Sequence, residues 1–334
     1  MRLLLSTSER FADHDNGRGH PERPARLDAV LAGIATAGVD DALIRVVPRP
    51  ATRSELELAH PPDFLDALAR FCEAGGGAID ADTVAVPASW DAAVLAAGAG
   101  PDAVERLDRG EADAAFCVVR PPGHHAMPTR AMGFCLVNNI AVTAGVLAER
   151  GERVLVLDWD AHHGNGTQAV FYADPRVLYV SLHEFPLFPF TGRLGDTGVG
   201  EGAGTTLNLP MPAGLTGDVA LAALDEVVAP VVEGFAPTWL LVSAGFDGHR
   251  ADPLTGLGLS SGDFADLTRR SLSFAPPGRR IAFLEGGYDL QALADSAGAF
   301  AAALTGADHR PEAATSGGPG RHVVDAAVTA LAAR

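Results

Sequence analysis

The sequence contains no lysine, because all 25 basic residues are arginines. Schiff-base chemistry and a lysine nucleophile are therefore excluded. Acidic residues number 42, which leaves a formal net charge of −17. A surface of this sign repels phosphates, so we expect no binding to nucleic acid. A cationic substrate would instead be attracted.

Cysteines and long apolar runs are also scarce. The three cysteines, Cys72, Cys117 and Cys135, are widely spaced and form neither a disulfide framework nor a CxxC metal site. This usage is typical of a reducing compartment, and we expect a cytoplasmic protein. The run Leu3–Leu5 is too short for the core of a signal peptide, and no stretch has the length of a membrane span.

The residues that are abundant form alternating apolar patterns, with a hydrophobic fraction of 47%. Short apolar runs are typical of strands buried on both faces: Ala114–Val119, Arg153–Leu157, Val177–Leu182, Trp239–Ser243 and Arg280–Leu284. Longer alanine-rich segments between them indicate helices: Pro24–Ala37, Pro62–Cys72, Trp90–Arg109, Asn139–Glu149, Asp218–Glu233 and Ser261–Ser273. The alternation predicts an α/β fold of three layers, in which helices cover both faces of a mainly parallel sheet.

The chain shows no internal repeat and little sign of a domain boundary. We expect one domain over residues 1–334, with a motif-bearing core over about 14–304 and a short tail and helix over 305–334. The one linker-like stretch is Ala313–Gly320, and a last helix is expected over Val323–Arg334.

Polar side chains follow four of the predicted strands, where each strand ends. Ligands of an open α/β sheet bind at the carboxyl ends of its strands, so these side chains are expected at one edge. They are His124 and His125 after the first strand, Asp158, Asp160 and His162 after the second, Asp247 after the fourth and Tyr288 after the fifth.

The pattern Asp158-x-Asp160-x-His162 places three polar side chains on one face if the strand continues. Two neighbouring carboxylates repel each other unless a cation lies between them. Asp160 and His162, together with Asp247, would leave a fourth position open for water, as in catalytic zinc sites. Oxygen and nitrogen ligands also suit Fe²⁺ or Co²⁺. The alternative is that the two aspartates cap a helix or form a turn.

The pair His124-His125 follows a Pro-Pro-Gly turn that would hold both rings stiffly. An imidazole can accept a proton from an activated water and donate it to a leaving group. Asp158 and Asn165 are available to fix the tautomers of the two rings. The alternative is a pair of ordinary loop histidines.

An aromatic set completes the pattern. A phenol at Tyr288, after two glycines, can donate to an oxyanion, although such a tyrosine can also be a packing residue. Phe134, Phe185 and Phe188 lie in loops at the same edge and can either wall a narrow channel or anchor the loops on the core.

Six motifs, taken in order, resemble those of the zinc-dependent histone deacetylases and acetylpolyamine amidohydrolases. They are RPPGHHA, GFCLVNNIA, DWDAHHGNGTQ, SLHEFPLFP, SAGFDGHRADPLTGL and EGGY. The segment His14–Leu27 (HDNGRGHPERPARL) is similar to the class II branch and its bacterial members. The resemblance implies an arginase-like α/β fold and hydrolysis of an N-acetyl amide, with acetyl-lysine or an acetylpolyamine as substrate. It leaves the natural substrate and a homo-oligomeric state open.

The resemblance also implies a role for each matching residue. Zinc would be bound by Asp160, His162 and Asp247; His125 would be the general base beside His124, with Asp158 and Asn165 orienting the two rings; and Tyr288 would polarise the acetyl carbonyl. The substrate tunnel would include Gly133, Phe134, Phe188, Leu254 and Gly286. A structural K⁺ or Na⁺ would use Asp158, Asp160, His162, Ser181 and Leu182, a second such ion would use Phe171, Asp174 and Val177, and Arg26 would match an arginine of the product-exit channel.

Individual positions refine this resemblance. Asn165 stands where the class I branch has aspartate, and the retained Tyr288 argues against the weakened subtype that has histidine. Leu254 stands where an animal polyamine deacetylase has a selective glutamate. Phe190, in PFTG, departs from the usual PGTG and is expected to narrow the mouth or displace the loop.

Two other functions remain as alternatives. A ureohydrolase with two manganese ions would need another aspartate at position 164, where this sequence has Gly164. A non-enzymatic acetyl binder would be expected to lose Tyr288, a metal ligand or a tandem histidine, and all of these are present.

Overall fold

The computed structural model describes residues 1–333 and is built around an eight-stranded sheet. All neighbouring strands in it are parallel, in the order β2-β1-β5-β10-β9-β6-β7-β8. The strands are β1 (Leu3–Ser6), β2 (Leu43–Val46), β5 (Ala114–Cys117), β6 (Val154–Asp158), β7 (Val177–Glu184), β8 (Thr206–Met211), β9 (Trp239–Ala244) and β10 (Arg280–Leu284). A separate antiparallel pair is formed by β3 (Gly77–Ala78) and β4 (Val84–Ala85).

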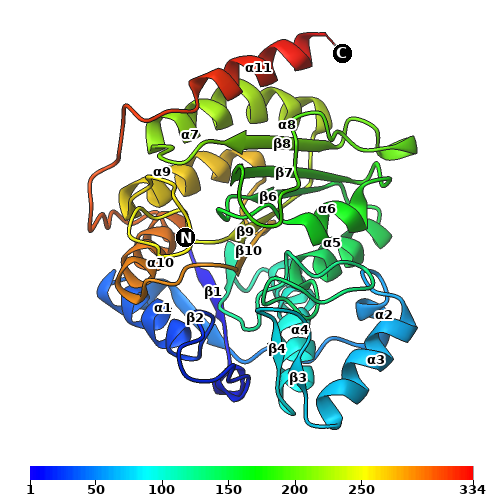
Figure 1. Cartoon of the computed structure of the whole chain (residues 1–334). Helices are drawn as coiled ribbons and strands as arrows, with labels where there is room; N and C mark the ends of the chain where they lie inside the picture. Colours follow the sequence, from blue (N-terminus) through cyan, green and yellow to red (C-terminus); the bar gives the residue numbers. More distant parts are fainter. Residues whose placement is uncertain (334) are drawn as a thin grey trace.

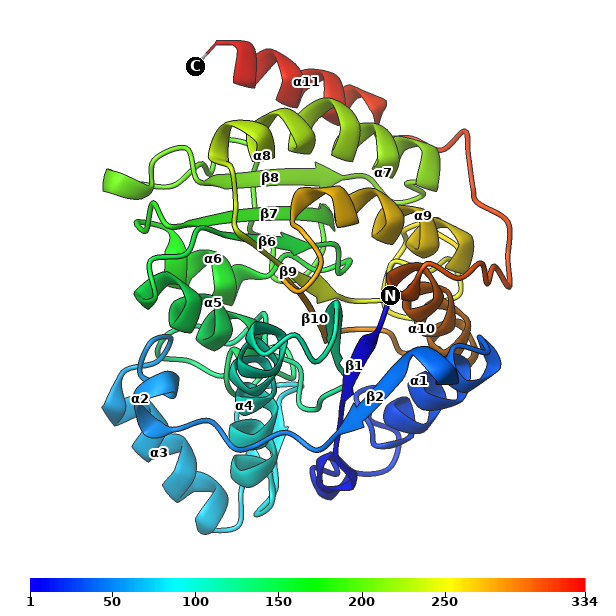
Figure 2. The ribbon, with the colours of Figure 1, turned by 180° about the vertical axis from the view of Figure 1, so that it is seen from behind.

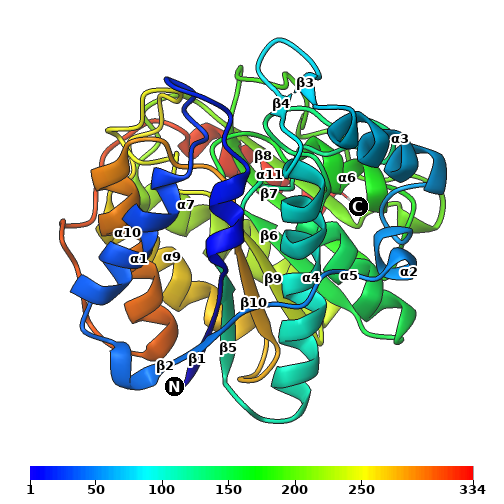
Figure 3. The ribbon, with the colours of Figure 1, turned by 90° about the horizontal axis from the view of Figure 1, so that it is seen from below.

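Helices cover both faces of this sheet, which confirms the predicted three-layer α/β architecture (Figures 1 and 2). Figure 3 shows α1, α9 and α10 on one side and α4 and α5 on the other. The α-helices are α1 (Ala25–Thr36), α2 (Arg53–Leu56), α3 (Pro62–Glu73), α4 (Ser89–Asp108), α5 (Asn139–Glu149), α6 (Asn165–Phe171), α7 (Gly217–Ala223), α8 (Ala229–Phe235), α9 (Ser261–Ser271), α10 (Leu290–Thr305) and α11 (Arg321–Ala332).

The five predicted strands are confirmed, with ends that differ by at most two residues. Their side chains are buried along the whole length of each strand, as expected for a sheet covered on both faces. Three further strands of the main sheet, β1, β2 and β8, were not predicted, and neither was the separate pair of β3 and β4. The run Leu3–Leu5 belongs to β1, whose leucines are fully buried between β2 and β5. A run of this length is too short to show a period, so neighbouring strands define it.

The predicted helices are confirmed in position, but α2, α6 and α10 were not predicted, and one predicted helix is divided. The segment predicted as one helix over Asp218–Glu233 is α7 and α8 joined by a π-helical turn at Leu224–Val228. No helix was predicted at α10, although Asp289 caps it by accepting the backbone N–H of Ala292. The last helix begins at Arg321, and Arg334 lies outside the described residues.

Over residues 1–333, no helix combines the length and the apolar composition that crossing a membrane requires. The parallel sheet directs the carboxyl ends of β5, β6, β9 and β10 to the same edge. In register, Asp158 at the end of β6 lies beside Ser243 of β9 and Ser181 of β7. The loops that follow these strands therefore start close together, and the polar motifs lie on them.

Candidate active site

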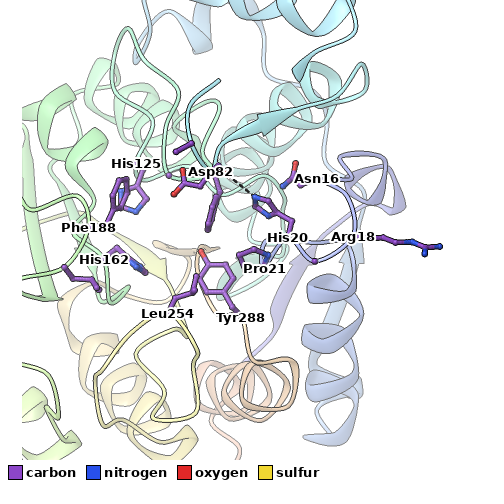
Figure 4. Close-up of a pocket in the computed structure, with 15 residues that line it drawn as sticks. Asn16, Arg18, His20, Pro21, Asp82, His125, His162, Phe188, Leu254 and Tyr288 are labelled. Carbon is purple, nitrogen blue, oxygen red and sulfur yellow. Dashed lines mark hydrogen bonds between the residues drawn. The ribbon is translucent and has the colours of Figure 1, made fainter. Parts of the chain in front are cut away.

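A cavity of about 590 Å³ opens at this edge of the sheet (Figure 4). Its lining combines loops that are far apart in the sequence. At its base lie His125, His162 and Tyr288, and its walls include Gly133, Phe134, Phe188 and Leu254. The other lining residues are Leu187, Ala81, Asp82 and, from the N-terminal loop, Asn16, Arg18, Gly19, His20 and Pro21.

Three of the predicted ligands form one cluster, in which single ligand atoms of Asp160, His162 and Asp247 lie within 4.8 Å of one another. Nδ1 of His162 is 3.2 Å from Oδ1 of Asp160 and 2.8 Å from Oδ2 of Asp247. Ligands about 2.0–2.1 Å from a tetrahedral zinc ion are separated by roughly 3.3 Å, so the cluster has the size that one such ion needs.

The charges in this cluster also favour a cation. Burial, together with the charge of Asp160, raises the pKa of Asp247 to about 7. Burial lowers the pKa of His162, but hydrogen bonds to Asp160 and Asp247 outweigh it and raise that pKa to about 10. A proton on Nδ1 thus occupies the place between two carboxylates that a metal ion would take. The residues fit a divalent cation with two oxygen ligands and one nitrogen ligand.

His125 faces the cavity and is held by Asn165 at the start of α6. Nδ1 of His125 lies 2.7 Å from Oδ1 of Asn165. An amide oxygen only accepts, so Nδ1 carries the hydrogen and Nε2 is left with the free lone pair. Burial lowers the pKa of His125 well below its usual value, and the neighbouring His124 adds to this effect. Both effects favour the neutral form of the His125 imidazole.

His124 has the opposite environment, although its ring lies only 4.1 Å from that of His125. Its Nδ1 is 3.0 Å from Oδ2 of Asp158, and the same oxygen accepts the hydroxyl of Tyr179 at 3.2 Å. Burial lowers the pKa of His124, but Asp160 and Asp158 outweigh it and raise that pKa well above its usual value. The two histidines thus differ in their preferred protonation state, a difference that is common in acid–base sites.

Tyr288 lies on the loop after β10, edge-on to Phe134 with ring centroids 5.8 Å apart. Burial raises the pKa of its phenol well above the usual value, so the hydroxyl remains a donor. Phe188 lies opposite, 5.2 Å from the His125 ring. Phe185 is not among the residues lining this cavity. Its ring instead contacts the Arg193 guanidinium, 5.5 Å from the ring centroid.

Of the other predicted site residues, some line the cavity and others lie outside its lining. Gly133 lines the cavity, whereas the backbone N–H of Gly286 donates to Asp160 (2.8 Å). Ser181 lies beside Asp158 in the β6–β7 register, with Leu182 next to it. Of the residues predicted for a second monovalent ion, Phe171 ends α6, Val177 begins β7, and Asp174 forms an ion pair with Arg176 (2.8 Å).

A buried ionic cluster lies close to Tyr288, and of its members only Arg26 was predicted, as a residue of a product-exit channel. The Glu22 carboxylate contacts Arg120, which precedes the tandem histidines, and Arg26 of α1. Burial opposes the ionisation of Glu22, but the two arginines outweigh it and lower its pKa to about 2. Arg26 also donates to the backbone oxygens of Glu285 and Gly287. The cluster thereby joins the loop before the histidines to the loop before Tyr288.

Glu285 and Tyr179 are two further residues whose place in the site was not predicted. The Glu285 carboxylate accepts the backbone N–H groups of Gly123 (2.7 Å) and His124 (3.2 Å). One sequence signal could have identified Tyr179: it lies two residues before Ser181, so the period of a strand places both on one face. For Glu285 the signal was only its place at the end of a strand.

Two charged residues, Asp82 and Arg18, are among the lining residues at the mouth of the cavity. Asp82 lies before β4, and its backbone oxygen accepts a hydrogen bond from His20 (2.9 Å). Figure 4 shows Arg18 extending away from the group formed by His125, His162 and Tyr288. Leu254 adds an apolar side chain to the rim and is 38% exposed.

Phe190 has a strained backbone close to this mouth. Its φ is +64°, in the left-handed region, and its side chain is 65% exposed. Its N–H donates to Leu187 (2.7 Å), which lines the cavity. The conformation explains why glycine is suited to this position, since a residue with a Cβ loses roughly 1–2 kcal/mol there.

Replacing Phe190 by glycine should therefore raise the free energy of unfolding by about 1 kcal/mol. The exposed ring has little packing to lose, so relief of the backbone strain dominates. Chemical denaturation measures the change. Phe190→Ala is the matched control, because it removes the ring but keeps the Cβ; equal stability of the two variants would contradict the strain argument.

Comparison with known proteins identifies the family to which this fold and site are similar. The histone deacetylase domain matches residues 20–304. A probable deacetylase from Archaeoglobus fulgidus is 38% identical over 292 residues, which cover 85% of this chain and 80% of that protein. A histone deacetylase-like amidohydrolase from Pseudomonas aeruginosa is 38% identical over 278 residues, or 81% and 73% of the two chains.

The fold agrees with these relatives. The crystal structure of the HDA15 HD domain superposes with a TM-score of 0.90 at 35% identity, over 98% of this chain and 93% of that one. The three-layer α/β architecture is thus arginase/deacetylase-like, as the motifs predicted. The chain belongs to the histone deacetylase family.

Proposed function

We propose that this protein is a zinc-dependent amidohydrolase that removes acetyl or short acyl groups from acylated amines, with acetyl-lysine as the main substrate type. The observation that carries the proposal is the convergence of His125, His162 and Tyr288 on one cavity. Amide hydrolysis requires a general base, a metal ligand and an oxyanion donor that all contact the same cavity.

Asp160, His162 and Asp247 would hold the metal. When bound, zinc acidifies the attacking water and polarises the acyl oxygen. Fe²⁺ or Co²⁺ would suit the same ligands. Next to this cluster, Asp158, Ser181 and Leu182 would share a structural K⁺ or Na⁺ with Asp160 and His162, in line with the register of β6 and β7.

The chain's own groups can carry the proton. Nε2 of His125 accepts it from the attacking water, since Nδ1 is already bonded to Asn165. Tyr288 donates to the oxyanion as it forms. His125, now protonated, returns the proton to the departing amine. His124, paired with Asp158 and outside the cavity lining, packs beside the ring that carries the proton, with ring centroids 4.1 Å apart.

The geometry argues against a dinuclear ureohydrolase. A Cβ on Gly164 would lie 2.2 Å from Oδ2 of Asp158 and 2.6 Å from the hydroxyl of Tyr179. An aspartate at this position, which a second metal would need, has no space. A metal-to-protein ratio near two would restore that alternative.

A small cationic amide is the second candidate substrate. Asp82 at the mouth and the net charge of −17 favour the free amine of an acetylpolyamine. The apolar Leu254 at the rim has no such preference.

We expect the zinc-loaded enzyme to show its highest kcat/KM on an acetyl-lysine peptide, in a panel with free acetyl-lysine, N-acetylputrescine and N8-acetylspermidine. A preference of at least about tenfold would separate the classes. A preference of that size for the acetylated polyamines would identify the second candidate. Absence of hydrolysis across the panel and a wider set of acyl amides would contradict the proposed activity.

A further inference from the structure

Asp252 connects two parts of the cavity wall through one carboxylate. It lies in the loop after β9, five residues beyond Asp247, and is 7% exposed. Its Oδ2 accepts the backbone N–H of Tyr288 (2.7 Å), and its Oδ1 accepts the backbone N–H of Leu254 (2.9 Å). The rim residue and the tyrosine at the base are thus bonded to the same side chain.

The backbone of Tyr288 needs such an anchor. Gly287 before it has a φ of +124°, a conformation available mainly to glycine, and a Gly-Gly pair gives the loop many alternatives. On the side preceding the tyrosine, Arg26 donates to the oxygen of Gly287 (2.7 Å). Asp252 bonds the N–H of Tyr288 itself and is the link from it to the loop that carries Asp247 and Leu254.

The rest of that loop is held firmly. The N–H of Asp252 donates to His249 (2.8 Å), and the His249 ring is bonded to Glu312 of the C-terminal segment (2.6 Å). Asp252 therefore extends from a fixed support, and a carboxylate with two acceptor oxygens is the group that two N–H donors require.

We propose that Asp252 is a positioning residue that sets the orientation of Tyr288 and couples it to Leu254 at the mouth. The expected effect on turnover rests on the proposed function. The expected effect on the position of Tyr288 rests only on these hydrogen bonds. A substrate that displaces Leu254 would act on the same carboxylate that holds the tyrosine.

The test is Asp252→Asn, which keeps the shape but offers one acceptor oxygen to two donors. We expect kcat to fall by about tenfold to a hundredfold, because small misplacements of a catalytic group are costly, with KM within about twofold and metal content unchanged. Asp266→Asn is the matched control, since it removes the same charge from a residue paired with Arg310 outside the cavity, and it should retain wild-type kcat.

A double-mutant cycle shows whether Asp252 acts through the tyrosine. In a Tyr288→Phe background, Asp252→Asn should lower kcat by less than about twofold, since the hydroxyl to be positioned is already absent. A full, multiplicative loss in that background would overturn the proposal. Loss of metal from Asp252→Asn, or an unchanged kcat, would overturn it as well.

A second readout is independent of activity. The chain has three tyrosines, so fluorotyrosine labelling gives three ¹⁹F signals, and Tyr288→Phe assigns one of them. Asp252→Asn should shift or broaden that signal and leave those of Tyr172 and Tyr179 in place. An unchanged Tyr288 signal refutes the positioning role even if no substrate is hydrolysed, whereas an inactive wild type with the expected shift refutes only the proposed activity. Should Asp252→Asn not fold, Asp252→Glu replaces it with the same expected results.

Discussion

Asp247→Ala should abolish stoichiometric zinc binding and, with it, hydrolysis. The substitution removes one of three ligands and one of two negative charges from a cluster in which Nδ1 of His162 lies 2.8 Å from the lost oxygen. Loss of a residue that merely supports a ligand costs about 10–100-fold in metal affinity, so loss of the ligand itself should cost more than about a hundredfold. Metal analysis after dialysis, combined with the peptide assay, measures both effects.

Two companion variants isolate the cause. Asp247→Asn keeps an oxygen that can accept the N–H of Ala161, as Oδ1 of Asp247 does at 2.8 Å, but removes the charge. It should preserve the local fold and still bind zinc weakly. Asp266→Asn, which changes the net charge equally at a distance from the cavity, should bind one equivalent. Wild-type zinc affinity in Asp247→Ala would reject this ligand.

The proximity of the three proposed metal ligands could be predicted from sequence, because a parallel sheet brings strand ends together. Asp160 and His162 follow β6, Asp247 follows β9, and these two strands are neighbours. Only the direction of each strand and its polar C-terminal residues are needed for that inference, and both are local features.

The mouth could not be predicted in this way. Asp82 and His20 belong to loops 62 residues apart that meet through a side-chain-to-backbone hydrogen bond. Asp82 follows no strand of the main sheet directly, and His20 lies beyond the end of β1, a strand that was not predicted, so the predicted strands give no information about the position of either residue. The proposed role of Asp252 could not be predicted either, because it depends on which backbone N–H groups lie near its carboxylate in the folded loops. Chemistry at strand ends is thus readable from the chain, while contacts between loops depend on tertiary packing.

Tyr288→Phe should lower kcat by at least about tenfold while zinc remains bound, because loss of one oxyanion donor typically costs 10²–10³-fold. The ring can stay in place, since its edge contact with Phe134 (5.8 Å) and the Arg26 guanidinium above it (5.1 Å) do not involve the hydroxyl. KM should change little, because the donor acts on charge that develops only in the transition state.

The matched control is Tyr172→Phe, which removes a phenol from the end of α6, outside the cavity lining. It should retain wild-type turnover, so that a loss confined to Tyr288→Phe reports the cavity hydroxyl itself. Equal turnover of Tyr288→Phe and wild type, with both fully loaded with zinc, would remove the oxyanion role. A joint loss of zinc and turnover would instead assign Tyr288 to the support of the metal cluster, through the loop in which Gly286 donates to Asp160. Metal content measured beside kcat therefore decides between donation to the substrate and support of the ligands.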